Sequence, residues 1–144
     1  MTTRIINSRH DLAALVRFLK SRLPSTVTIS KGRKRSADQN RLQRMWLNEA
    51  AEQLGEYTPE EYRAYCKLHF GVPILRAESE EFCEAYDNLF RDRFDYEEKL
   101  RLMAVPMDFP VTRLMTSKQK TAYLDAMYQH FYGQGVNLTR PDRL

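Results

Sequence analysis

Helix starts constrain the fold of this chain more than any other feature of its sequence. A serine or threonine followed three residues later by an acid or an amide is typical of a helix start, because the two side chains can cap backbone amides of the first turn. Such pairs occur at Ser8, Ser36, Thr58 and Thr116. Each pair precedes apolar residues at helical spacing. The sequence therefore predicts a chain dominated by helices.

The residues that break helices give each predicted helix an end. Pro24 ends the helix that starts after Ser8, and Gly55 ends the helix that starts at Ser36. The helix after Thr58, which has Pro59 at its first position, is expected to stop at Gly71 and Pro73, and the last helix is expected to run from 116 to 133. Residues 78–98 keep helical spacing, and the stretch around Pro106 and Pro110 is expected to form a loop or an edge strand.

Two short segments have the composition of β-strands instead. Residues 4–7 are short and rich in β-branched side chains, and residues 26–30 alternate between small polar and β-branched side chains. With one helix between them, they predict a small β-α-β start. The expected fold class is α+β: a helix-dominated single domain of residues 1–144 with a small β-sheet. Residues 136–144 are expected to form a flexible tail.

Length and composition agree with an ordinary globular protein. The chain has 144 residues, of which 42% are hydrophobic and 29% charged, enough for one domain with a core. No apolar run is long enough for a transmembrane helix, the N-terminus has no secretory apolar stretch, and a membrane partner is not predicted. Cys66 and Cys83 lie in unrelated contexts and are expected to be reduced thiols in the cytoplasm, although a disulfide between them stays an alternative.

A basic segment is the clearest indication of function. Between residues 31 and 44 there are six cations and one acid, a local charge of +5, whereas the whole chain carries +4. Cations grouped before and along the first turns of a helix suit a phosphate-bearing partner, because the helix N-terminus also attracts anions. We therefore expect nucleic acid to be bound through its phosphates by Lys31, Arg33, Lys34, Arg35, Arg41 and Arg44.

Three polar or aromatic residues near these cations have two possible roles each. Gln39 either completes the cap at Ser36 or contacts nucleic acid, and Asn40, which has no capping role, is the better contact candidate. Trp46 lies on the apolar face of the predicted helix, so burial is expected rather than stacking on a base. A weaker second group of candidate contacts is Arg113, Lys118 and Lys120.

Residues 78–98 have the opposite charge, with nine acids and two arginines. Glu80, Glu84 and Asp87 are spaced to converge on one helix face, so a metal-dependent nuclease or junction resolvase is a rival hypothesis. A solvated acidic face is the more common use of such residues, so no catalytic residue, no metal ligand and no cofactor is predicted. The acids could also repel DNA or pair with the basic loop of a second subunit. Another rival hypothesis is an interaction module whose basic segment docks an acidic peptide.

The segment Arg35-Ser36-Ala37-Asp38-Gln39-Asn40-Arg41, between the Val27-Thr28-Ile29 strand and Trp46, resembles the "R-S-x-D-Q-N-R … W" segment of the phage NinB family. The stretch from Thr112 to Val136 is similar to the closing helix of that family. The resemblance implies an α+β fold and a non-enzymatic recombination mediator, in a phage or prophage, that acts in the cytoplasm of the bacterial host. Such a protein forms a homodimer, binds single-stranded DNA and helps the host single-strand-binding protein to load a recombinase. The segment 73–110 has no counterpart in the family pattern.

Overall fold

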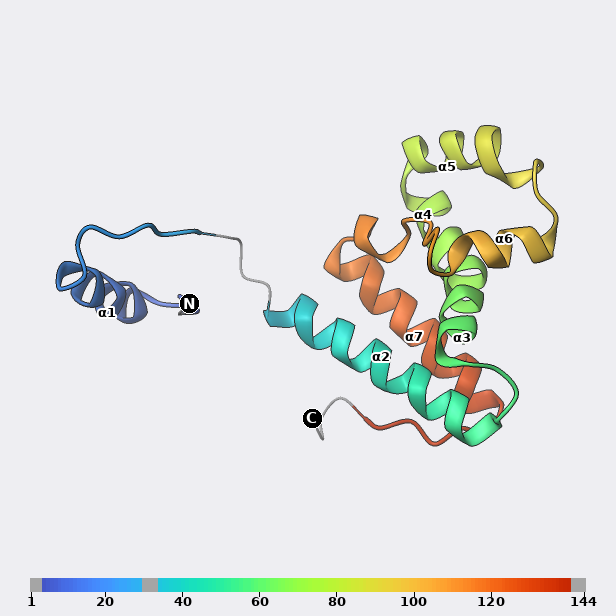
Figure 1. The fold of residues 1–144 in the computed structure, drawn as a ribbon, viewed down its shortest axis with the longest axis horizontal. Coiled ribbons are helices and arrows are strands. Elements are labelled where there is room, and N and C mark those ends of the chain that lie inside the picture. Colours follow the sequence, from blue (N-terminus) through green and yellow to red (C-terminus); the bar gives the residue numbers. More distant parts are fainter. Residues whose placement is uncertain (1–3, 30–33, 141–144) are drawn as a thin grey trace. The chain divides into compact units, whose positions relative to one another are not determined.

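The computed structural model describes residues 4–29 and 34–140 (Figure 1). Where the sequence predicts one domain, the chain divides into two compact units, Met1–Ala37 and Asp38–Leu144, and we describe each by itself. None of the helices in the described ranges is both long and apolar enough to cross a lipid bilayer.

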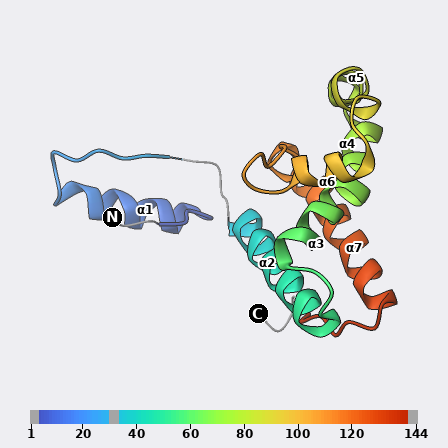
Figure 2. The same cartoon turned by 45° about the vertical axis from the view of Figure 1, so that its right-hand side comes forward.

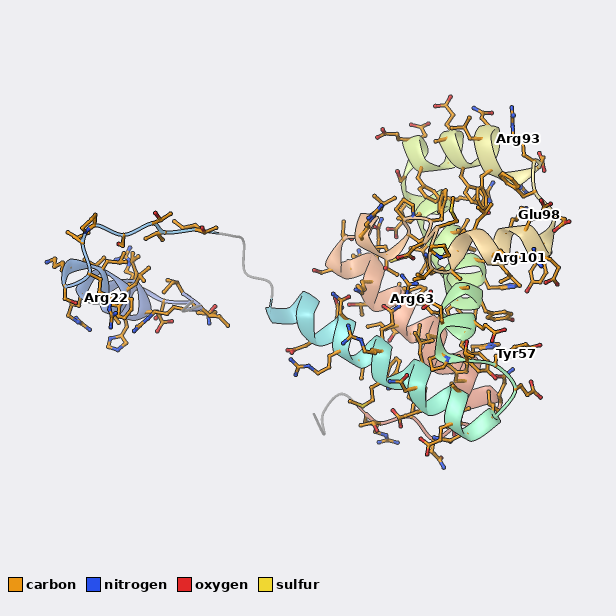
Figure 3. All side chains as sticks on the ribbon, in the orientation of Figure 1. Arg22, Tyr57, Arg63, Arg93, Glu98 and Arg101 are labelled. Carbon is orange, nitrogen blue, oxygen red and sulfur yellow. The ribbon has the colours of Figure 1, made fainter. Side chains whose placement is uncertain are left out.

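The N-terminal unit contains one helix, α1 (Arg9–Lys20). Its predicted start is confirmed: the Ser8 side chain accepts a hydrogen bond of 3.1 Å from the amide of Asp11. Arg4 and Arg22 place their guanidinium groups over the ring of Phe18, 4.2 and 4.3 Å from its centre. The helix is thus capped by its own neighbouring residues. Because no residue of α1 is buried, however, the helix contributes nothing to a core (Figure 3).

The α+β prediction is wrong for the described part of the chain, which contains no β-strand and no sheet. Residues 4–7 and 25–29 are irregular, and Ile29 is largely exposed. Ser30, the last residue of the second expected strand, lies outside the described residues. Strand preference depends on packing against a neighbouring strand, and neither segment has one here. Short runs of β-branched residues were therefore an insufficient basis for a sheet.

Two long helices, α2 (Lys34–Leu54) and α7 (Ser117–Gly133), lie side by side and run in the same direction (Figures 1 and 2). The predicted end of α2 at Gly55 is confirmed, and the backbone there has φ +68°. Its predicted start is wrong by two residues, because Ser36 lies inside the helix. Together with α3 these helices bury one core cluster, which consists of Leu42, Trp46, Leu47, Ala50, Tyr62, Cys66, Tyr123, Leu124, Met127, Phe131 and Val136.

Helix α3 (Pro59–Cys66) begins with the predicted capping pair of Thr58 and Glu61. The chain then continues through one wide π-turn, η1 (Lys67–Gly71), into α4 (Val72–Glu78). The prediction that Gly71 and Pro73 stop the helix is therefore wrong. Pro73 falls in the first turn of α4, where a missing amide hydrogen is tolerated, and the π-turn takes up the change in hydrogen bonding.

The acidic segment is divided into α5 (Glu80–Tyr86), the π-turn η2 (Asp87–Arg91) and α6 (Tyr96–Met103), with breaks around Ser79 and at 92–95. A loop and the short 3₁₀ helix η3 (Thr112–Leu114) then lead to α7. These elements and α4 enclose a second core cluster, which consists of Ala64, Val72, Leu75, Tyr86, Phe90, Met103 and Val111.

A charged network joins the loop of residues 104–111 to α3 and η1. Lys67, which is almost fully buried, donates 2.7 Å hydrogen bonds to Asp108 Oδ1 and to the carbonyl of Met103. Arg63, labelled in Figure 3, donates to Asp108 at 2.7 Å and to Glu60 at 2.9 Å. Burial lowers the pKa of Lys67, and the hydrogen bonds from Lys67 and Arg63 lower the pKa of Asp108. Every charge of the network therefore has an opposite partner.

The chain after α7 lies along α2 over residues 136–140. Val136 is buried, and the carbonyl of Thr139 accepts a 2.7 Å hydrogen bond from the indole of Trp46. The amide and hydroxyl of Thr139 donate to the carboxylate of Glu49. The first residues of the expected flexible tail are thus held by specific contacts, and residues 141–144 lie outside the described residues.

Candidate nucleic-acid interface

The basic segment is described from Asp38 onward. Lys31 and Arg33 lie outside the described residues, and Lys34 and Arg35 open α2 with side chains that are not described. The geometry of the predicted site therefore rests on the part of α2 from Asp38 to Asn48 and on the helix beside it.

Gln39 joins the second turns of α2 and α7. Its Nε2 donates a 2.9 Å hydrogen bond to the hydroxyl of Thr121, and the carbonyl of Ser117 lies 3.5 Å from the same nitrogen. The Thr121 hydroxyl donates in turn to the Ser117 carbonyl. The Gln39 side chain thus points at α7, and its amide group makes a contact between the two helices.

The opposite side of α2 carries the predicted contacts Asn40, Arg41 and Arg44, all of them exposed. Arg41 lies 3.9 Å from the carboxylate of Asp38, and the side chains of this pair are 68% and 51% exposed. An ion pair this exposed is worth little, so it leaves the Arg41 guanidinium available to a stronger anion. Residues three apart on a helix are neighbours, so Arg41 and Arg44 form one short cationic edge.

The start of α7 lies on the other side of α2 from this edge, where Gln39 contacts it, and it has a positive potential of its own. Thr116 and Gln119 cap it reciprocally, with hydrogen bonds of 3.2 and 2.9 Å, as predicted. Because α2 and α7 run in the same direction, the positive ends of their dipoles lie on the same side. Of the weaker candidates, Arg113 and Lys118 are exposed. Lys120 is only 7% exposed and burial lowers its pKa, so it is poorly placed for a phosphate.

Trp46 belongs to the core, as predicted. It is 3% exposed, its ring centre lies 5.4 Å from that of Tyr128, and its indole nitrogen is occupied by Thr139. It cannot stack on a base in this structure. The sequence did not reveal an aromatic cluster elsewhere in the molecule: Tyr65 stacks on His69 and on His130, with ring centres 4.0 and 5.1 Å away.

The acids of the rival nuclease hypothesis do share one surface. Glu80, Glu84 and Asp87 line an open hollow of about 580 Å³. Asp87, however, accepts two 2.9 Å hydrogen bonds from Arg76, which lower its pKa, and Arg91 lies 3.7 Å away. The described residues include no group of three or more acidic, histidine or cysteine side chains arranged to hold a metal ion. The hollow therefore gives no geometric support for metal-dependent cleavage.

Both cysteines are free thiols, as expected. Cys66 is fully buried, and burial raises its pKa to about 12, so it is a poor nucleophile at neutral pH. Cys83 is partly exposed and lies 3.6 Å from Asp87.

Comparison of this chain with protein-family models, with curated proteins and with solved structures finds no match. The resemblance to the NinB family accordingly stands on the residues that carry it, chiefly 35–41, and the sheet that it implied is the part that the structure contradicts.

Proposed function

We propose that this protein binds single-stranded DNA through its phosphates along the N-terminal half of α2. One observation carries the proposal: Gln39 holds the second turn of α2 against the second turn of α7, while Arg41 and Arg44 stay exposed on the other side of α2. The six cations of residues 31–44 supply the charge for this contact. Duplex DNA presents the same phosphates and is the alternative ligand.

The chemistry of such a contact is electrostatic and independent of base sequence. Arginine side chains bind phosphate oxygens in pairs, and the free amides of a helix start add donors to the same anion. Asn40, exposed beside Arg41, is suited to a sugar or base edge. Binding of this kind releases counterions, so its affinity falls steeply with salt concentration.

The biological role that we propose is a non-enzymatic recombination mediator of a phage or prophage. It rests on the resemblance of residues 35–41 to the NinB segment, and these residues lie within the basic segment 31–44. In this role the protein, as a homodimer in the bacterial cytoplasm, binds single-stranded DNA and cooperates with the host single-strand-binding protein.

A salt titration tests the binding site. Affinity for a single-stranded oligonucleotide is measured by fluorescence anisotropy across a salt series, for the wild type and for Arg41→Ala/Arg44→Ala. Loss of two phosphate contacts should flatten the slope of log affinity against log salt by about 1.4 units. Arg33→Ala/Lys34→Ala/Arg35→Ala should flatten it by about 2 units.

Arg93→Ala/Arg101→Ala is the matched control, because both arginines are exposed and lie on other elements (Figure 3). It should leave the slope unchanged. If the control and the α2 variant flatten the slope equally, binding is diffuse and the site is wrong. If the wild type does not bind oligonucleotides at all, the function is wrong.

The nuclease hypothesis has its own test. Single-stranded and branched DNA are incubated with the protein and Mg²⁺ or Mn²⁺, and products are separated on a denaturing gel. We expect no cleavage. Cleavage that disappears in Glu84→Ala would instead establish an enzyme centred on the acidic hollow.

A further inference from the structure

An apolar groove lies on the C-terminal unit, on the side of α5 and η2 away from the acidic hollow. Its volume is about 240 Å³, and its lining is formed by Phe82, Ala85, Tyr86, Leu89, Phe90, Phe109, Pro110 and Leu114. Leu89 is 68% exposed, although it belongs to this lining. Exposed apolar side chains around a groove are typical of an interaction site.

Carboxylates border this groove. The acidic hollow is lined from the same helical segment by Glu80, Glu81, Glu84 and Asp87, none of which lines the groove. Glu81 stands one turn before Ala85, so a carboxylate lies at the edge of the apolar lining. A ligand that fits this surface needs an apolar stripe with cations beside it.

The N-terminal segment of this chain has these properties. Leu12, Leu15, Val16 and Leu19 form one stripe of α1, and Leu12 is 51% exposed. Arg9 and Lys20 lie one turn from Leu12 and Val16, beside the stripe. Residues 4–29 contain five cations and one acid, a charge of +4, and no residue of α1 is buried.

We infer that α1 of a second copy of this chain docks its apolar stripe in the groove of α5 and η2. The contact is reciprocal: each copy donates its N-terminal helix and receives the helix of the other, which gives a closed two-fold dimer. Charge complementarity supports this occupant, because the N-terminal segment is strongly basic and residues 78–98 carry nine acids against two arginines. The inference gives the proposed homodimer a specific contact, and to that extent it rests on the proposed function.

The physical reason for the contact is that α1 alone is poorly stabilised. A helix of 12 residues is marginal in water, and an amphipathic helix derives most of its stability from burial of its apolar face. Docking in the groove covers both exposed apolar surfaces at once. The flanking charges orient the helix and make its association sensitive to salt.

The mass of the full-length protein in solution tests this contact. Analytical ultracentrifugation over a concentration series should give, for the wild type, twice the 17.0 kDa mass of one chain. Leu89→Asp, and separately Leu12→Asp/Val16→Asp, should weaken the dimer by about tenfold or more, because each places a charge in the apolar contact. High salt should weaken the wild-type dimer as well.

Two controls address folding and specificity. Met107→Asp introduces the same charge at a side chain that is 68% exposed and does not line the groove, and it should leave the dimer intact. Trp46 fluorescence should be unchanged in all variants, because Trp46 lies in the core away from the contact, and circular dichroism should be unchanged for Met107→Asp. An equimolar mixture of the groove variant and the α1 variant should form a mixed dimer, since one intact contact of the two remains.

A wild-type protein that stays monomeric, or variants that keep the wild-type dimer, would overturn the inference. Oligonucleotide binding, measured on the same samples, separates this from the proposed function. Leu89→Asp should keep the salt slope per protomer, and Arg41→Ala/Arg44→Ala should keep the dimer. A wild type that dimerises but does not bind oligonucleotides therefore contradicts the proposed function. A wild type that binds oligonucleotides but stays monomeric contradicts the docking of α1 in the groove.

Discussion

Helices α1 and α2 differ in what their sequences and their surroundings contribute. Helix α1 has a well-formed cap at Ser8 and an apolar stripe, yet none of its residues is buried. Helix α2 starts two residues before its predicted cap at Ser36, yet it buries Trp46 and Leu47 against α7 and α3. A helix is therefore specified by local patterns, whereas its contribution to stability depends on what covers it.

The same contrast holds for charged groups. Asp108 and Lys67 form a short contact in a part of the molecule where Lys67 is hidden from water, whereas Asp38 and Arg41 form a long and exposed one. The first contact is structural and the second is free to exchange partners. Four predictions use such pairs of sites to test the comparison.

The largest effect is expected for truncation of a buried leucine. Leu47→Ala, on α2, should lower the free energy of unfolding by about 2–5 kcal/mol, because it removes packed atoms and leaves a cavity. Leu12→Ala, on α1, should change the free energy of unfolding of a single chain by no more than about 0.5 kcal/mol, because no residue of α1 is buried within that chain. Urea denaturation monitored by Trp46 fluorescence measures both. Equal effects would contradict the description of α1 as uncovered.

Removal of Lys67 should have the next largest effect. Lys67→Ala leaves the carbonyl of Met103 without its 2.7 Å donor and leaves Asp108 with Arg63 as its remaining donor, and a loss of about 3 kcal/mol is expected. Arg41→Ala, which removes only an exposed pair, should be nearly neutral. Thermal unfolding of both variants checks the difference. A neutral Lys67→Ala would show that the network contributes no stability.

Gly71 and Gly133 form a smaller matched pair. A Cβ atom at Gly71 would lie 2.5 Å from Val111 Cγ1, whereas one at Gly133 would have nothing within 4 Å. Gly71→Ala should therefore cost about 1–3 kcal/mol through overpacking. Gly133→Ala should be neutral or stabilising. The midpoints of denaturant unfolding compare the two, and equal midpoints would mean that Val111 moves aside freely.

The smallest effect on stability is expected when the pH is lowered. Hydrogen bonds from Lys67 and Arg63 lower the pKa of Asp108, so the unfolded chain binds its proton more readily than the folded one. Stability from this group is present at neutral pH and is lost as the pH falls below about 4. Since the carboxylate is partly exposed, the loss should be about 1 kcal/mol.

Asp108→Asn should reduce this acid dependence, and Asp125→Asn, at an exposed position on α7, should not. Unfolding midpoints at pH 6 and pH 3 measure the effect. The idea fails if both variants keep the full dependence of the wild type.

The helix starts at Ser8, Thr58 and Thr116 could be predicted because each depends on contacts within four residues. The strands at 4–7 and 26–30 could not be judged locally, since a strand exists only with a partner strand. Continuation of the chain through Gly71 and Pro73 depends on a π-turn, which has no clear sequence pattern. In the candidate site, the exposure of Asn40, Arg41 and Arg44 followed from the face of the helix on which they lie.

By itself the sequence determined where α1, α3 and α7 begin, which faces are apolar, and that basic and acidic residues lie in separate segments. These properties depend on neighbours along the chain. Only the tertiary structure decided that Gln39 reaches Thr121, 82 positions away, that Asp87 is held by Arg76, and that the stripe of α1 stays exposed while that of α2 is buried. Such outcomes depend on packing between distant elements, which no local pattern encodes.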